Sequence, residues 1–162
     1  MSSNGNIVMS FEARRATAFT VAGVLFVADI AILLFNLAAG TEDQYLTLGQ
    51  ALIGAAWAVG FIGLLGFYPS LRDRSPWLAR IGGVFSVVGV VTMVVMAVAS
   101  LGVFLGVLGG VLGDYTPYFL PGVFLGIVLG FGPYGVAILR TEAYTPRVGL
   151  LFLVLVATFL FN

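Results

Sequence analysis

Cysteine, histidine and lysine are all absent from the chain. Without cysteine and histidine, the protein cannot form disulfides, ligate haem through histidine or build a Cys/His zinc site. Without lysine it cannot form a Schiff base, and the usual pairs of nucleophile and base are missing too. We therefore expect no catalytic residue, no bound metal and no cofactor, and we predict that the protein is not an enzyme.

Charged residues are also scarce. Charged residues make up 9% of the 162 residues and hydrophobic residues 60%, and the mean hydropathy is +1.12. A soluble domain is about a quarter charged. The few charges gather in short segments between long apolar runs, so we predict an all-α, polytopic transmembrane helix bundle, surrounded by the lipid bilayer of the plasma membrane. The formal net charge of zero gives no reason to expect nucleic acid as a partner.

Five apolar runs are the predicted membrane spans. They cover about residues 17–39, 48–67, 81–108, 118–139 and 148–161, within a single membrane domain of residues 1–162. At about 1.5 Å per residue, the first run extends roughly 34 Å, enough for a bilayer core of ~30 Å, whereas the last extends only about 22 Å. The last helix therefore relies on its neighbours and a thinned membrane, or the chain is a shortened six-span protein.

The N-terminal segment has two interpretations. Residues 1–11 are small and polar and are predicted to be flexible, with the first span following them. The alternative is a cleaved signal peptide, because the first apolar run ends in the small residues Ala38, Ala39 and Gly40. That run is too long for a signal peptide and contains a charged residue, so a membrane span is the favoured interpretation.

The seven arginines determine the predicted orientation. All of them lie beside span ends, in segments expected at the cytoplasmic membrane surface: Arg14, Arg15, Arg72, Arg74, Arg80, Arg140 and Arg147. Because arginine-rich segments stay in the cytoplasm, an even number of spans must separate Arg80 from Arg140. Two spans fit, with a turn near residues 109–121. The prediction is therefore five spans, with the N-terminus in the cytoplasm and the C-terminus outside.

The arginines also begin a predicted internal repeat. Residues 13–31 and 79–97 are identical at seven of nineteen positions, including Arg14 and Arg80, and a third copy starts at Arg147. Each unit would be a hairpin of two spans, and successive units would have the same orientation. Chance agreement is the alternative, because both segments are rich in glycine, valine and alanine.

Two series of glycines are predicted to pack helices against each other. The members of each series are four residues apart, and they are Gly102, Gly106 and Gly110 near the outer end of the third span and Gly122, Gly126 and Gly130 in the fourth span. Such series let helices approach closely in lipid, where packing drives association. We expect the third and fourth spans to pack on each other; contact within one chain and contact between subunits both remain open.

Asp29 is the candidate centre of an intramembrane polar site. It is the thirteenth residue of a 23-residue apolar run, where an ionised side chain costs at least about 2.5–3.5 kcal/mol. Asn36 lies seven residues later on the same helical face, and Thr92 is the third candidate member of the site. The carboxyl either binds a proton or cation, or is a neutral hydrogen-bonding group that holds helices together.

The segment GLLGFYPSLRDRSPWLARIGGVFSVVG, residues 63–89, has arginine as its only basic residue. It resembles small multi-pass membrane proteins of high-GC, salt-adapted prokaryotes, whose functions are not established. The resemblance covers most of the chain and implies a bundle of five or six spans, but it assigns no role to any residue.

The sequence is compatible with two candidate functions. The first is a non-catalytic membrane subunit or scaffold that packs through glycine-rich helices, as a homo-oligomer or with a larger membrane-protein partner. The second is a small transporter or channel for protons, cations or a small solute that uses Asp29.

Overall fold

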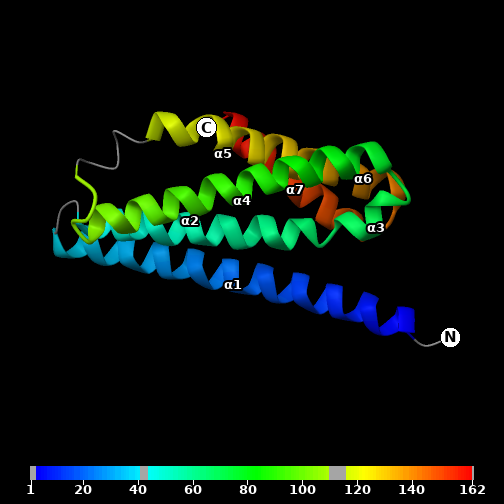
Figure 1. Ribbon diagram of the computed structural model, residues 1–162, viewed down its shortest axis with the longest axis horizontal. Helices are drawn as coiled ribbons and strands as arrows, with labels where there is room; N and C mark the ends of the chain where they lie inside the picture. Colours follow the sequence, from blue (N-terminus) through cyan, green and yellow to red (C-terminus); the bar gives the residue numbers. More distant parts are fainter. Residues whose placement is uncertain (1–2, 41–43, 110–115, 162) are drawn as a thin grey trace.

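The computed structural model describes residues 3–40, 44–109 and 116–161, and every regular element in these ranges is a helix (Figure 1). The elements are α1 (Ser3–Ala39), α2 (Gln44–Leu65), α3 (Tyr68–Arg72), α4 (Pro76–Phe104), α5 (Thr116–Gly126), the π-helical turn η2 (Ile127–Phe131), α6 (Gly132–Thr141) and α7 (Pro146–Phe161). The elements α5, η2 and α6 follow one another without a break. The all-α prediction is confirmed for the described residues.

Four helical stretches are long and apolar enough to cross a membrane. They are Ala13–Ala39, Thr47–Leu65, Pro76–Phe104 and Pro117–Thr141. The last helix, α7, is apolar but has only 16 residues, which extend about 24 Å and fall short of a ~30 Å hydrocarbon core. The described chain is therefore a bundle with four helices of membrane-spanning length and one shorter apolar helix.

The start of α1 differs from the sequence-based expectation. Residues 3–11, predicted to be flexible, continue the first apolar helix toward the N-terminus. No proline interrupts this segment, and adding residues to an existing helix is far easier than nucleating a new one. The polar composition of the segment therefore does not end the helix.

The helix α2 lies between α1 and α4, which are its two main neighbours (Figure 1). Its contact with α1 runs along small residues at intervals of seven: Gly49, Ala56 and Gly63. A Cβ atom on Gly63 would lie 3.1 Å from the ring of Phe19, and Ala56 is fully buried. Small residues at a heptad spacing allow two helix backbones to approach closely in lipid.

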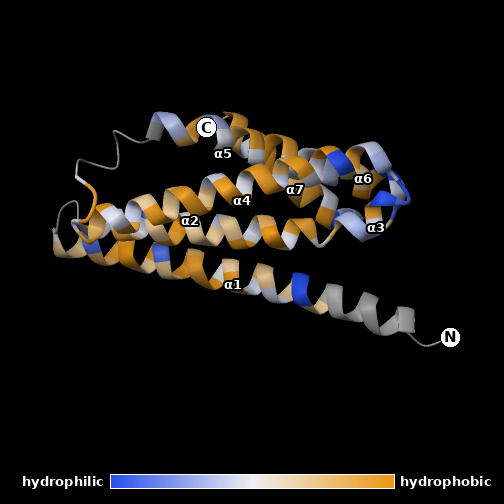
Figure 2. Cartoon of the chain, in the orientation of Figure 1, coloured by the Kyte–Doolittle hydropathy of each residue, from blue (hydrophilic) through white to orange (hydrophobic). Residues whose placement is uncertain are grey.

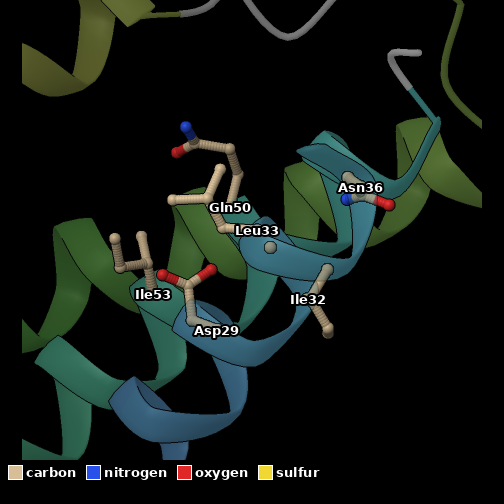
Figure 3. Close-up of a pocket in the computed structure, with 7 residues that line it drawn as sticks. Asp29, Ile32, Leu33, Asn36, Gln50 and Ile53 are labelled. Carbon is tan, nitrogen blue, oxygen red and sulfur yellow. The ribbon is translucent and has the colours of Figure 1, made fainter. Parts of the chain in front are cut away.

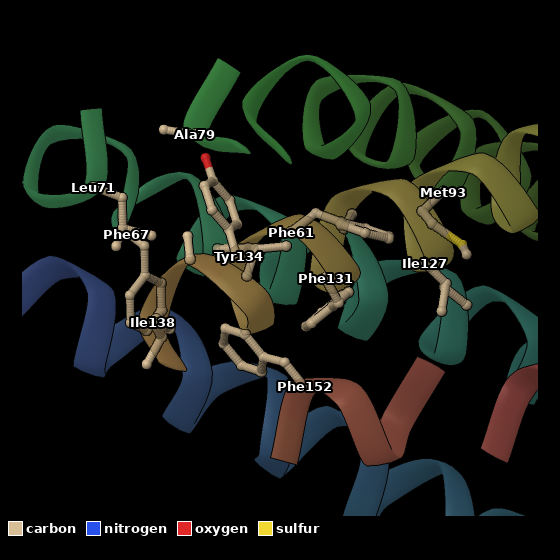
Figure 4. Close-up of a cluster of buried hydrophobic side chains, with 13 residues drawn as sticks. Phe61, Phe67, Leu71, Ala79, Met93, Ile127, Phe131, Tyr134, Ile138 and Phe152 are labelled. Carbon is tan, nitrogen blue, oxygen red and sulfur yellow. The ribbon is translucent and has the colours of Figure 1, made fainter. Parts of the chain in front are cut away.

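The core is centred on Phe61 of α2, which is fully buried (Figure 4). Its ring lies against Gly89 of α4 and Gly126 of α5, where added Cβ atoms would come within 2.7 Å and 3.0 Å of ring carbons. The ring centroid lies 5.4 Å from that of Phe131, and Phe131 in turn lies 5.2 Å from Phe152 of α7. Aromatic rings therefore fill the space between α2, α4, η2 and α7.

The second glycine series faces α4. A Cβ atom on Gly122 would collide with the hydroxyl of Thr92, and one on Gly126 would lie 2.8 Å from Cα of Gly89. One turn farther along, Gly130 lies opposite Ser86 of α4. These glycines therefore line the contact between α4 and the α5–η2 segment.

Gly102 and Gly106 of the first glycine series do not face the second series, contrary to the expected pairing: Gly102 lies against Leu108, and Gly106 has no side chain or backbone of another segment within 4 Å of its Cβ position. Gly106 follows the end of α4 with a φ of 70°, and the amides of Gly106 and Val107 donate to the carbonyls of Val103 and Gly102. This is the hydrogen-bond pattern of a Schellman cap, which glycine favours because it adopts positive φ without strain. The helix predicted to reach residue 108 therefore ends at Phe104, and Gly110 lies outside the described residues.

A close crossing joins α6 and α7. A Cβ atom on Gly135 would lie 3.0 Å from the carbonyl oxygen of Gly149, and a Cβ atom on Gly149 would lie 2.9 Å from the carbonyl oxygen of Gly135. Neither backbone could come this near if either residue carried a side chain. The short helix α7 is thereby held against the longer segment beside it.

We predict that Gly89→Ala destabilises the bundle relative to Gly23→Ala. Both changes raise helix propensity equally, but a Cβ atom on Gly89 would lie 2.7 Å from the Phe61 ring, whereas one on Gly23 meets nothing within 4 Å. Overpacking of this kind costs about 1–3 kcal/mol. Unfolding by denaturing detergent in mixed micelles measures the difference, and equal stability of the two variants would contradict the Phe61 packing.

Candidate functional site

A polar pocket lies between α1 and α2 (Figure 3). Its volume is about 160 Å³, and its lining residues all come from these two helices: Asp29, Ile32, Leu33, Asn36, Gly49, Gln50 and Ile53. Leu33 and Gln50 are exposed, so the pocket opens on the flank of the bundle. Asp29 is the only acidic residue within the four long apolar helices, which makes this pocket the candidate functional site.

The Asp29 carboxylate packs against Gly49 of α2. A Cβ atom on Gly49 would lie only 2.9 Å from Oδ1 of Asp29, so the missing side chain provides the space for the carboxylate. In Figure 3 the carboxylate points toward α2, with Ile53 and Gln50 on the facing helix. The polar group is therefore directed at the α1–α2 contact and away from the core around Phe61.

Asn36 and Gln50 add amide groups to the pocket. Asn36 is only 5% exposed and lies two turns along α1 from Asp29, on the face that the helical spacing predicts. Gln50 and Gly49 were not identified from the sequence as members of the site. Gln50 is the single amide side chain in the described Thr47–Leu65 stretch. A lone amide in an apolar helix is the feature of the sequence that could have indicated its place in the site.

Thr92 does not belong to this pocket. Its hydroxyl and methyl groups lie against Gly122 of α5, on the side of α4 that faces α5. The pocket is lined by α1 and α2 alone. The predicted grouping of Thr92 with Asp29 is therefore not observed, because sequence spacing gives the face of a single helix but not the neighbour of that face.

All seven arginines lie at one end of the bundle, which we call the arginine-rich end. It comprises the start of the apolar part of α1, the segment from α3 to the start of α4, and the loop between α6 and α7. Figure 2 shows hydrophilic residues gathered at the α3 and α6–α7 loops, with apolar residues along the helices. Arg72 pairs with the adjacent Asp73 at 3.3 Å, which is the one ion pair among the residues whose side chains the structure describes.

Arg15 is packed into the arginine-rich end. Its guanidinium carbon lies 4.4 Å from the ring centroid of Phe67 and 4.7 Å from that of Tyr144. The Tyr144 hydroxyl donates to Oγ of Ser70 at 2.8 Å, which ties the last loop to α3. Arg15 therefore connects α1 to two segments distant in the sequence.

The remaining arginines have other surroundings. Arg74 donates from Nη1 to the carbonyl oxygen of Thr141 at 3.2 Å, and thus joins the loop between α3 and α4 to the C-terminal end of α6. The Arg80 guanidinium lies 6.0 Å from the ring centroid of the exposed Trp77. The side chains of Arg14, Arg140 and Arg147 are exposed and have no carboxylate partner among residues 13–40, 47–109 and 117–161, whose side chains the structure describes.

In comparisons with known proteins, no protein family, curated protein or solved structure matches this chain. Function must therefore be inferred from the geometry.

We predict that Arg15→Gln destabilises the protein by about 1 kcal/mol, because it removes a cation that stacks on two aromatic rings. The neighbouring Arg14→Gln is the matched control, since Arg14 contacts no ring among the described residues and its replacement should change stability by less than about 0.5 kcal/mol. Unfolding in mixed micelles measures both. Equal effects would show that net charge, and not the stacking, matters at this position.

Proposed function

We propose that this protein is a non-catalytic membrane subunit or scaffold that associates with another membrane-spanning polypeptide through α1. The observation that carries this proposal is the position of the Asp29 pocket on the flank of the bundle. A carboxyl group near the middle of a lipid-facing helix costs about 2.5–3.5 kcal/mol unless a polar partner covers it. A transmembrane helix of a second copy or of a larger protein supplies such cover.

The packing of the bundle supports an assembly role over a solute pathway through its centre. Phe61, Phe131 and Phe152 occupy the space between α2, α4, η2 and α7 with rings 5.2–5.4 Å apart. In contrast, most described side chains of α1 are exposed. The least buried of the four long apolar helices thus also lines the polar pocket.

The proposed topology has five spans in the plasma membrane, with the arginine-rich end in the cytoplasm and the C-terminus outside. The gathering of all the arginines at one end supports this orientation. For α7 to cross the membrane, its 16 residues must rely on the close contact with α6 at Gly135 and on local thinning of the bilayer.

Tandem two-span repeats are also part of the proposal. The helix α2 ends at Leu65, and the π-helical turn η2 ends at Phe131, which is 66 residues later in the sequence. Tyr68 and Tyr134, separated by the same offset, both lie against Gly83 of α4. This coincidence of helix irregularities supports a shared origin for the two hairpins.

We expect cysteine labelling to establish the topology, because the chain contains no native cysteine. In intact cells, a membrane-impermeant maleimide should label Phe161→Cys from outside and should label Ser75→Cys only after permeabilisation. Labelling of both variants only after permeabilisation would mean that the membrane is crossed four times, with α7 on the cytoplasmic side.

We expect Asp29→Leu to weaken association about three- to thirtyfold, which corresponds to about 0.6–2 kcal/mol for hydrogen bonds between transmembrane helices. Asp29→Asn should retain most of the association because the amide also forms hydrogen bonds. Val27→Leu is the control, since Val27 is exposed on the same helix. Cross-linking in membranes and the size of complexes in mild detergent measure the effect; unchanged complexes of Asp29→Leu would overturn the proposal.

The alternative is a small transporter or channel, and the joint presence of Asp29, Asn36 and Gln50 in one pocket favours it as the second candidate. Proton or cation flux into liposomes containing the purified chain tests this function. Flux that is lost in Asp29→Asn would favour transport over assembly, because that variant retains the hydrogen-bonding capacity of the site.

A further inference from the structure

Two grooves flank the C-terminal end of α2 at the arginine-rich end. The first has a volume of about 230 Å³ and lies between α1 and α2, lined by Arg14, Arg15, Ala18, Ile62, Leu65, Gly66 and Pro69. The second has a volume of about 300 Å³ and lies between the end of α2 and α4, lined by Leu65, Tyr68, Arg80, Gly83, Val84 and Val87. Leu65 lines both grooves, so they lie on either side of the same helix end.

The two grooves have the same construction. Arg14 and Ala18 line the first, and Arg80 and Val84, each 66 residues later, line the second. In both grooves, the apolar residue follows the arginine by one helical turn, so the arginine and the apolar residue lie on the same face of their helix. Apart from its arginines, each groove is lined mainly by apolar residues; the guanidinium groups come from Arg14 and Arg15 in the first groove and from Arg80 in the second.

Among the residues whose side chains the structure describes, which are 13–40, 47–109 and 117–161, no carboxylate forms an ion pair with the arginines of these grooves. The one ion pair in these ranges joins Arg72 to Asp73, and neither of these lines a groove. Beside Arg80, Trp77 is 74% exposed, as is common for tryptophan at the level of lipid headgroups. An apolar helix in the groove would leave the guanidinium without a counter-charge, whereas a lipid with a phosphate would provide one.

We propose that each groove binds an anionic phospholipid, with an acyl chain along the apolar wall and the phosphate accepting hydrogen bonds from Arg14 or Arg80. Basic pockets between transmembrane helices at the cytoplasmic side suit such headgroups, and arginine binds phosphate through charge-assisted hydrogen bonds. In the second groove the chain lies along Val84 and Val87, which continue inward on the face of α4 that begins at Arg80. This proposal requires a membrane-embedded bundle, but it does not depend on the assembly role of Asp29.

Quenching of Trp77 by brominated lipids tests the second groove. The full chain with Trp57→Phe, which leaves Trp77 as the single tryptophan, is reconstituted in vesicles of phosphatidylcholine and phosphatidylglycerol with bromine on one lipid at a time. Phosphatidylglycerol should quench more strongly than phosphatidylcholine at the same fraction. Arg80→Gln should reduce this preference about fivefold, as expected for the loss of one arginine at a charged membrane surface.

Two controls distinguish lipid binding in the groove from a general attraction of anionic lipid to surface arginines. Arg140→Gln removes an exposed arginine that lines neither groove and should leave the preference unchanged. Val84→Phe fills the groove and should lower quenching, whereas Val91→Phe, on an equally exposed residue two turns farther along α4, should not. The side chains of Arg140, Val84 and Val91 are exposed, so these three substitutions do not alter the packing around Phe61 relative to the shared Trp57→Phe background.

Native mass spectrometry tests the pair of sites. The chain released from the mixed vesicles should retain two phosphatidylglycerol molecules. The Arg14→Gln variant and the Arg80→Gln variant should each retain one. Equal quenching by the two lipids, or equal effects of Arg80→Gln and Arg140→Gln, would overturn the proposal. Loss of the preference on adding inorganic phosphate would also overturn it, since the site would then bind phosphate without the acyl chain.

Discussion

The ring of Phe61 lies where α2, α4 and the α5–η2 segment come closest, over Gly89 and Gly126, which have no side chains. In lipid, the hydrophobic effect does not distinguish a leucine facing a neighbouring helix from one facing acyl chains, so close packing must hold the helices together. The rest of the bundle depends on this arrangement of one large ring among glycines. Phe131 and Phe152 extend the same contact to α7.

The same use of glycine produces the polar pocket. At the Gly49 position, the missing side chain leaves room for a carboxylate, whereas at the Gly63 position it leaves room for the Phe19 ring. Both glycines belong to the heptad series along α2, so a single packing rule places an apolar contact near the arginine-rich end and a polar contact farther along. The pocket is therefore a local exception within a regular helix pair, and it lies apart from the core around Phe61.

Much of the fold could be predicted from the sequence. The helical class, the position of the long apolar segments and the gathering of arginines at span ends follow from hydropathy and charge, which act through local composition. The glycine series was less predictable. Gly122, Gly126 and Gly130 do line a helix contact, but Gly106 caps a helix, because a glycine spacing is compatible with both close packing and positive φ.

The sequence alone determined that Asp29 and Asn36 share a face of one helix, since the helical repeat is a local property. Only the tertiary structure decided what that face meets. It placed Gly49 and Gln50 opposite Asp29, set Thr92 against Gly122 instead, and brought Arg15 onto rings from two distant segments. Which helices become neighbours depends on the fit of side chains over the whole interface, and no local pattern encodes that fit.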